Sequence, residues 1–304
     1  MNYVMYYEFD NFDDMYECIP VVRNGAAFSV FDCIVKFYTM NDKQVVFWVN
    51  GSNHTKIEAE EIFEKTTKVL SYLFSLPFCC EDNRRFEVDW CLEINSMLSK
   101  RSMNAIRVIE DKVNKFVKTE TFFTENLDLL IVAIDNLFKY RKEDAFVYFF
   151  KVIERIAKQY YVVYMQRHHT KAVTSKNKNE LKDMLRNYGL NSLGVELTED
   201  ILNRKVDLLY KEIKLEFYGS MFGKISLFVT KEDINISVNT ISKLVKLRNK
   251  IAHGDSVDEL KLTKYLGECE HLAMQMFSRQ FFKKKYEDIH IKSYRYFNKI
   301  DPYW

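Results

Sequence analysis

The amino-acid sequence predicts an α+β domain followed by an all-α helical bundle, so that the chain is mostly α overall. A chain of 304 residues is long enough for two domains. Its 47% hydrophobic residues and three prolines are typical of a well-folded globular protein. The apolar pattern also changes along the chain, from short strand-like runs to helical periodicity after Thr124. We therefore expect an α+β domain at 1–120, a helical bundle at 121–283 and a basic aromatic tail at 284–304.

The first 120 residues alternate strand and helix signals. Runs rich in Val, Ile, Phe and Tyr predict antiparallel strands at Tyr3–Phe9, within Ala26–Met40, at Gln44–Val49 and at Arg85–Ile94. Helical spacing predicts one helix at Thr55–Ser75, which Pro77 ends, and another at Ser102–Val117. This part of the sequence contains no phosphate-binding loop, catalytic spacing or repeat.

Beyond Thr124 the apolar residues recur mainly at helical spacing. The strongest amphipathic signal covers Lys142–Gln166, which places one broad apolar face on a long helix. Further helices are expected at Glu125–Tyr140, within the basic segment Lys171–Arg186, from Thr198 to about Tyr218, at Val238–His253 and at Ser256–Phe282. The apolar run Met221–Val229 fits either a strand or a helix.

The helix predicted at Val238–His253 has a clear buried side and a clear end. Helical spacing places three apolar residues on one side, namely Leu244, Leu247 and Ile251. Gly254 follows the last turn, where a left-handed glycine cap is common. His253 is therefore expected in the last turn, where the helix dipole favours the imidazolium form.

The same helix end carries Arg248, Asn249 and His253. Asn249 and His253 are four residues apart and share a face, and Arg248 lies between that face and the buried stripe. Histidine can transfer a proton near neutral pH, a guanidinium can hold phosphate oxygens, and Asn249 can orient either group. RNA cleavage through its own 2′-hydroxyl needs these functions and no metal. The spacing by itself also fits a surface arginine and a helix-capping histidine.

The segment Leu247-Arg248-Asn249 through Ala252-His253-Gly254 resembles the R-N-x-x-x-H signature of the HEPN superfamily. The helix pattern over roughly residues 124–283 is similar too, above all to the HEPN domains of ApeA-type and other abortive-infection proteins. The resemblance implies a helical bundle that forms a homodimer, in which the motifs of two protomers meet in one site.

This resemblance implies a metal-independent endoribonuclease, commonly a toxin of anti-phage defence. Arg248 would stabilise the phosphate, His253 would transfer protons, and Asn249 would be the polar residue that follows the arginine. Some members only bind or dimerise, so a catalytically silent HEPN-like dimerisation or RNA-binding module is the alternative. By analogy with ApeA-type proteins, the N-terminal domain would have a sensing or regulatory role.

HEPN domains often carry an acidic residue on the second helix near the motif, and Glu154 is the candidate here. An ordinary surface ion pair explains this glutamate equally well. The net charge is −5 over residues 1–120 and +7 over residues 121–304, so RNA contacts are expected in the C-terminal half. The candidate RNA-binding residues, which a solvated lysine face also explains, are Lys250, Lys171, Lys176 and Lys178.

The tail mixes Lys and Arg with aromatic residues, which can stack on bases or pack back onto the sheet domain.

No apolar run is long enough to cross a bilayer, and no signal-peptide pattern is found. The six cysteines have no C-x-x-C spacing, so reduced thiols are expected. We thus expect a cytoplasmic protein without metal, cofactor or membrane contact. Its expected partners are RNA, a second copy of itself, and an antitoxin or regulatory protein.

Overall fold

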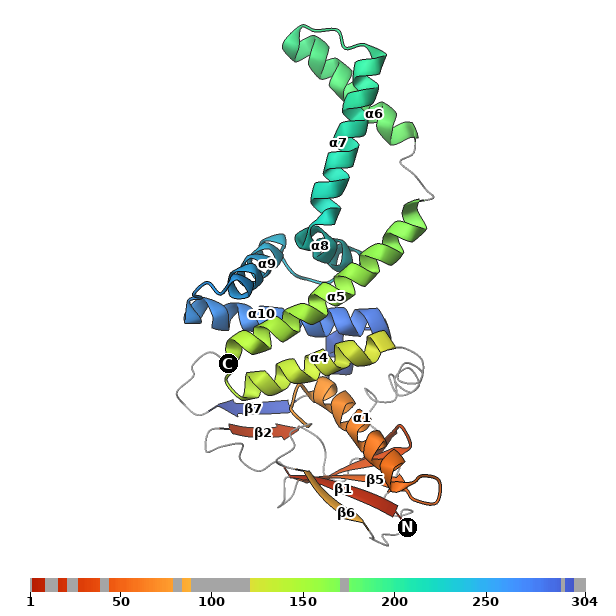
Figure 1. The fold of residues 1–304 in the computed structure, drawn as a ribbon, viewed down its shortest axis with the longest axis vertical. Helices are drawn as coiled ribbons and strands as arrows, with labels where there is room; N and C mark the ends of the chain where they lie inside the picture. Colours follow the sequence, from red (N-terminus) through yellow and green to blue (C-terminus); the bar gives the residue numbers. More distant parts are fainter. Residues whose placement is uncertain are drawn as a thin grey trace. The chain divides into compact units, whose positions relative to one another are not determined.

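The computed structural model describes residues 2–8, 16–20, 27–38, 44–78, 84–88, 121–169, 175–290 and 293–297. An α+β region comes first and a long helical region follows, as predicted (Figure 1). The predicted helix at Ser102–Val117 and the predicted strand beyond Val88 lie outside the described residues. None of the described helices combines the length and the apolar character needed to span a bilayer.

The strands are β1 (Asn2–Glu8), β2 (Tyr16–Pro20), β3 (Ala27–Val30), β4 (Cys33–Tyr38), β5 (Gln44–Asn50), β6 (Arg84–Val88) and β7 (Ser293–Phe297). The α-helices are α1 (Lys56–Phe74), α4 (Thr121–Phe138), α5 (Lys142–His169), α6 (Ser175–Tyr188), α7 (Glu199–Gly219), α8 (Met221–Lys231), α9 (Val238–His253), α10 (Glu259–Phe277) and α11 (Tyr286–Ile289). Two π-helical turns, η3 (Gly189–Leu193) and η4 (Ser278–Phe282), follow α6 and α10.

The chain forms two compact units, residues 1–152 with 258–304 and residues 153–257. This differs from the predicted division, in which one helical bundle ran from 121 to 283, because α4 and α10 belong to the same unit as the sheet. The physical reason is that α4 packs against α1. An amphipathic pattern shows that a helix buries one face, but it does not say which neighbour covers that face.

The first unit is built on an antiparallel sheet with strand order β3-β4-β5-β1-β6. In the middle of β1 both faces of the sheet are buried, since Val4 and Met5, which alternate along the strand, are each only 1% exposed. Val4 packs with Trp48 and Val46 on one face. On the other face α1 covers the sheet (Figure 1). The rings of Phe37 on β4 and Phe74 on α1 lie 5.5 Å apart.

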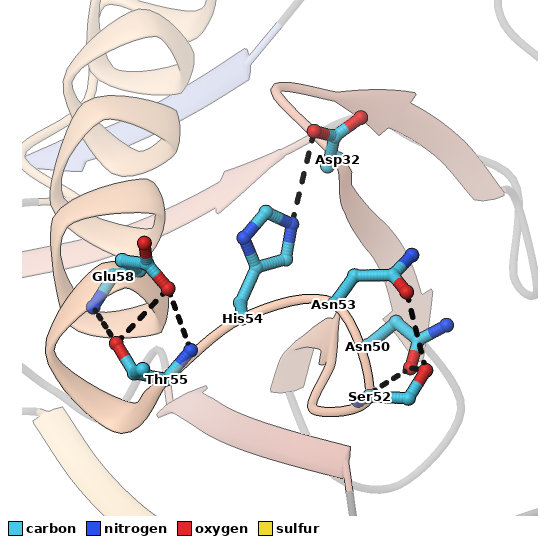
Figure 2. A network of polar contacts seen from close by, with 7 residues as sticks. All are labelled: Asp32, Asn50, Ser52, Asn53, His54, Thr55 and Glu58. Atoms are coloured by element: carbon cyan, nitrogen blue, oxygen red, sulfur yellow. Dashed lines mark hydrogen bonds and ion pairs between the residues drawn. The ribbon is translucent and has the colours of Figure 1, made fainter.

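Helix α1 begins at a capping box that Figure 2 shows in detail. The Thr55 hydroxyl accepts a hydrogen bond from the Glu58 amide at 3.3 Å, and the Glu58 carboxylate accepts one from the Thr55 amide at 2.7 Å. The Thr55 amide and hydroxyl thereby lower the pKa of Glu58. In the same view His54 Nε2 lies 3.8 Å from the carboxylate of Asp32, which belongs to the β3–β4 turn. The helix ends at Phe74 and Ser75 caps it, one residue before the predicted end and shortly before Pro77.

The C-terminal segment packs onto the α1 end and pairs with the N-terminal strand β2. Strand β7 pairs antiparallel with β2, and Cys18 lies opposite Arg295. The buried Tyr286 hydroxyl donates to the Tyr72 carbonyl oxygen at 3.0 Å and lies 2.9 Å from His290 Nδ1. Of the two roles considered for the tail, the described residues therefore favour packing.

The second unit comprises α5 from Ile153 onward and helices α6 to α9. The ambiguous run Met221–Val229 is helical and forms most of α8. The Ser220 hydroxyl caps α8 by accepting from the Gly223 amide at 3.0 Å.

In the first unit, the helix predicted to start at Ser256 begins at Glu259 instead, because the Asp258 carboxylate caps it by accepting from the Lys261 amide.

Candidate catalytic site at the end of helix α9

Helix α9 has the bounds that the sequence predicts, and both ends are capped. The Ser237 hydroxyl accepts from the Thr240 amide at 3.0 Å at the first turn. Gly254 takes the left-handed conformation, with φ 74° and ψ 18°, directly after His253. The Asp255 amide then donates to the Lys250 carbonyl oxygen at 3.0 Å, which completes the cap.

The predicted buried stripe holds this helix in place. Leu244 and Leu247 are 1% and 7% exposed, while Ile251, at the helix end, is half-buried. Ile241 extends the stripe by one turn and is 1% exposed. Helix α9 packs against α8 within the same unit (Figure 1).

Arg248 reaches back to helix α5 and pairs with Glu154. Its Nη2 donates to Glu154 Oε2 at 3.2 Å, and its Nη1 donates to Asn249 Oδ1 at 3.3 Å. The other oxygen of Glu154 accepts from Lys158 Nζ at 2.6 Å. A single carboxylate, only 16% exposed, therefore holds two cations.

The charge of Glu154 is set by this arrangement. Burial raises its pKa, but the hydrogen bond and charge of Lys158, followed by those of Arg248, outweigh burial and lower the pKa below the ordinary value of 4.5. Glu154 is thus ionised at neutral pH. With Lys158 and Arg248 it forms a cluster whose formal net charge is +1.

His253 lies on another side of the helix from Arg248. Five residues of α-helix turn the side-chain direction by about 140°, so the two groups of one protomer diverge. His253 is exposed, and it has no hydrogen bond or ion pair with any residue that the structure describes. The cluster at Arg248 and the imidazole of His253 are therefore separate within one chain.

No known protein family, curated protein or solved structure matches the chain.

The predicted RNA-binding lysines are only partly placed. Lys250 is exposed on α9, Lys176 and Lys178 lie in the first turn of α6, and Lys171 is outside the described residues. Sequence reasoning missed Lys243 and Lys246, which are exposed and line up with Lys250 at helical spacing. The signal was available, because no Asp or Glu occurs between Asp233 and Asp255.

Lys158 was also missed as part of the site. The signal for it was its position one helical turn after Glu154 on α5, a spacing at which opposite charges pair. Within the described ranges, no three His, Cys, Asp or Glu side chains lie close enough together to hold a metal ion.

Proposed function

We propose that this protein is a metal-independent endoribonuclease of the HEPN type, acting as a homodimer in anti-phage defence or as a toxin. One observation carries the proposal: Arg248, anchored by Glu154, and an exposed His253 without a partner among the described residues lie in the last turns of the same helix. The arginine supplies a fixed positive charge for a phosphate, and the histidine supplies a proton acceptor or donor.

The anchored guanidinium still has donors to offer. Arginine carries five N–H groups, and one bond each to Glu154 and Asn249 uses two of them. The rest can bind a phosphate oxygen, and the net positive cluster favours an anion there. Glu154 thus acts as a positioning residue that directs Arg248, and Lys158 offsets the negative charge of that carboxylate.

A dimer would supply the second histidine that the reaction needs. One His253 would take the proton from the 2′-hydroxyl, whose oxygen attacks the phosphorus. The bond from phosphorus to the 5′-oxygen then breaks, and the other His253 would protonate that oxygen. The products are a 2′,3′-cyclic phosphate and a free 5′-hydroxyl. Because one histidine must start neutral and the other charged, the rate should follow a bell-shaped pH profile.

Helix α9 carries a seam suited to such a dimer. Val238, Val245 and Ala252 recur every seven residues and form an apolar line beside Asn249 and His253. Val238 is 65% exposed, and Ala252 is also exposed. The same seam would serve a silent dimerisation module, which is the second candidate function.

The decisive experiment measures RNA cleavage by the purified protein in EDTA. We expect RNA ends that carry 2′,3′-cyclic phosphates, and His253→Ala should slow cleavage by about 100-fold or more. His271→Ala, which removes another exposed histidine, is the matched control and should cleave at the wild-type rate.

Two outcomes would overturn the nuclease proposal. Cleavage by His253→Ala at the wild-type rate would show that this histidine is not catalytic. Intact RNA with the dimer preserved would favour the silent module, unless expression in cells is toxic and Arg248→Ala relieves the toxicity. That last result would indicate that a regulatory partner or trigger is missing from the purified reaction.

A further inference from the structure

A row of tyrosines and lysines lies where the second half of α5 meets α8. Lys224 Nζ lies 5.4 Å from the ring centre of Tyr161, and Lys231 Nζ lies 5.8 Å from that of Tyr164. Both separations are within the range of cation–π attraction. We call these two pairs the Tyr–Lys track.

The track is held on a fixed base. Tyr160 packs edge-on against the buried Phe228 of α8, with ring centres 4.8 Å apart, and it stacks on Tyr164 at 6.4 Å. Tyr161, Tyr164 and Lys224 are themselves half-buried and so partly open to solvent, and Lys231 is exposed. The rings therefore have a defined position before any ligand arrives.

No carboxylate of the described residues neutralises the lysines of the track. Within the part of the chain that the structure describes, neither Lys224 nor Lys231 forms an ion pair with a carboxylate. Glu232 and Asp233 follow Lys231 directly and weaken the positive potential at that end. The stronger half of the track is therefore Tyr161 with Lys224.

The track continues from the candidate catalytic site along α5. Glu154, Lys158 and Tyr161 are four and then three residues apart, so they lie on one line of the helix. Seven residues of α-helix separate Glu154 from Tyr161, a rise of about 10 Å. A chain whose phosphate is bound at Arg248 could thus reach Tyr161 within a short stretch.

We propose that the Tyr–Lys track binds single-stranded RNA and leads it to the Arg248 cluster, an inference that rests on the proposed nuclease function. Aromatic rings stack on unpaired bases of any sequence, and nearby lysines bind the phosphates between them. A paired helix does not offer its base faces in this way. The substrate class is therefore unpaired RNA, read without strong sequence preference.

The positive charge of the track also favours RNA over a second copy of this chain as the molecule that binds there. If two copies met across the track about a two-fold axis, the lysines of one would face the lysines of the other. Like charges brought together without counter-charges oppose such an interface. A polyanion meets no such opposition.

The test measures binding, separately from cleavage, by fluorescence anisotropy. The probe is a labelled 2′-O-methyl oligouridine, which lacks the attacking hydroxyl and stays intact. Tyr161→Ala and Lys224→Ala should each weaken its binding by about tenfold, and Tyr161→Phe should bind like the wild type because stacking needs only the ring. Lys151→Ala is the matched control, since Lys151 lies 4.4 Å from the Tyr148 ring on another side of α5.

Each result distinguishes the proposal of the Tyr–Lys track from the proposal of a nuclease. Unchanged binding by Tyr161→Ala and Lys224→Ala overturns the track, even if His253 proves catalytic. Weakened binding in both, without any cleavage by the wild type, supports the track and favours the silent RNA-binding module over the nuclease. Weakened binding that accompanies loss of the dimer, seen by light scattering, shows that a second copy covers this face and overturns the track. Equal affinity for duplex RNA overturns the stacking mechanism.

Discussion

Arg248 pairs with Glu154, whose carboxylate is kept ionised by two cations, Lys158 and Arg248 itself. Burial opposes the ionisation of Glu154, yet Lys158 and Arg248 lower its pKa below 4.5. A group whose pKa is lowered in the folded protein contributes stability above its unfolded pKa, and this contribution is lost as the pH falls through the folded value. The Glu154–Arg248 pair is therefore complete at neutral pH and breaks only in acid.

Glu154→Gln should consequently lower the melting temperature at pH 7, because Arg248 and Lys158 lose their shared counter-charge. The difference from the wild type should shrink as the pH falls below the ordinary value of 4.5 and through the lowered pKa of the native carboxylate, which then takes up a proton. Thermal unfolding followed by circular dichroism between neutral and acid pH measures this. Glu143→Gln, an exposed carboxylate on the same helix, is the control and should have little effect. A difference that stays constant with pH would contradict the ionic origin.

Helix α9 sets the position of the site through its C-terminal cap. Gly254 has φ 74°, and a Cβ added there would meet no atom within 4 Å. Any residue with a side chain is disfavoured in this conformation by backbone strain alone. The glycine thus ends the helix directly after His253 without any steric demand from the surroundings.

We expect Gly254→Ala to lower the free energy of unfolding by about 1 kcal/mol. Gly219→Ala is the matched control, because it too has no atom within 4 Å of the added Cβ but lies in the last turn of α7 at an ordinary φ. That control should be neutral or slightly stabilising. Urea unfolding of the two variants measures the difference. Equal stability of Gly254→Ala and the wild type would show that the cap adapts to a side chain.

The whole molecule must pair with a copy of itself for the proposed site to be complete. Within one chain the Arg248 cluster and His253 diverge around α9, and His253 has no partner among the described residues. The exposed apolar line through Val238 and Ala252 runs beside it. Dimerisation and cleavage should therefore depend on the same helix face.

Val238→Asp should reduce both the dimer and RNA cleavage. An acidic residue in the first turn does not weaken a helix, so the effect reports the interface and not the fold. Leu260→Asp is matched to it, since Leu260 is 68% exposed in the first turn of α10. Light scattering coupled to size exclusion measures the mass of each variant. A dimer that survives both Val238→Asp and Ala252→Asp would place the interface elsewhere.

Much of the local structure of this protein can be predicted from the sequence alone. The ends of α1 and α9, the buried stripe through Leu244 and Leu247, and the left-handed Gly254 all follow from caps and spacing that act within a few residues. The order of an α+β region before a helical one follows from the change in apolar period. These are local rules, and one chain segment is enough to apply them.

Only the tertiary structure decided which segments meet. The pairing of Arg248 with Glu154, of Tyr161 with Lys224, and of β2 with β7 each joins residues far apart in the chain. The grouping of α4 and α10 with the sheet belongs to the same class. Periodicity tells which face of an element is buried, but the choice of partner depends on how all the faces pack at once. The site therefore consists of a locally encoded helix end and a carboxylate, Glu154, whose contact with Arg248 depends on how α5 and α9 pack.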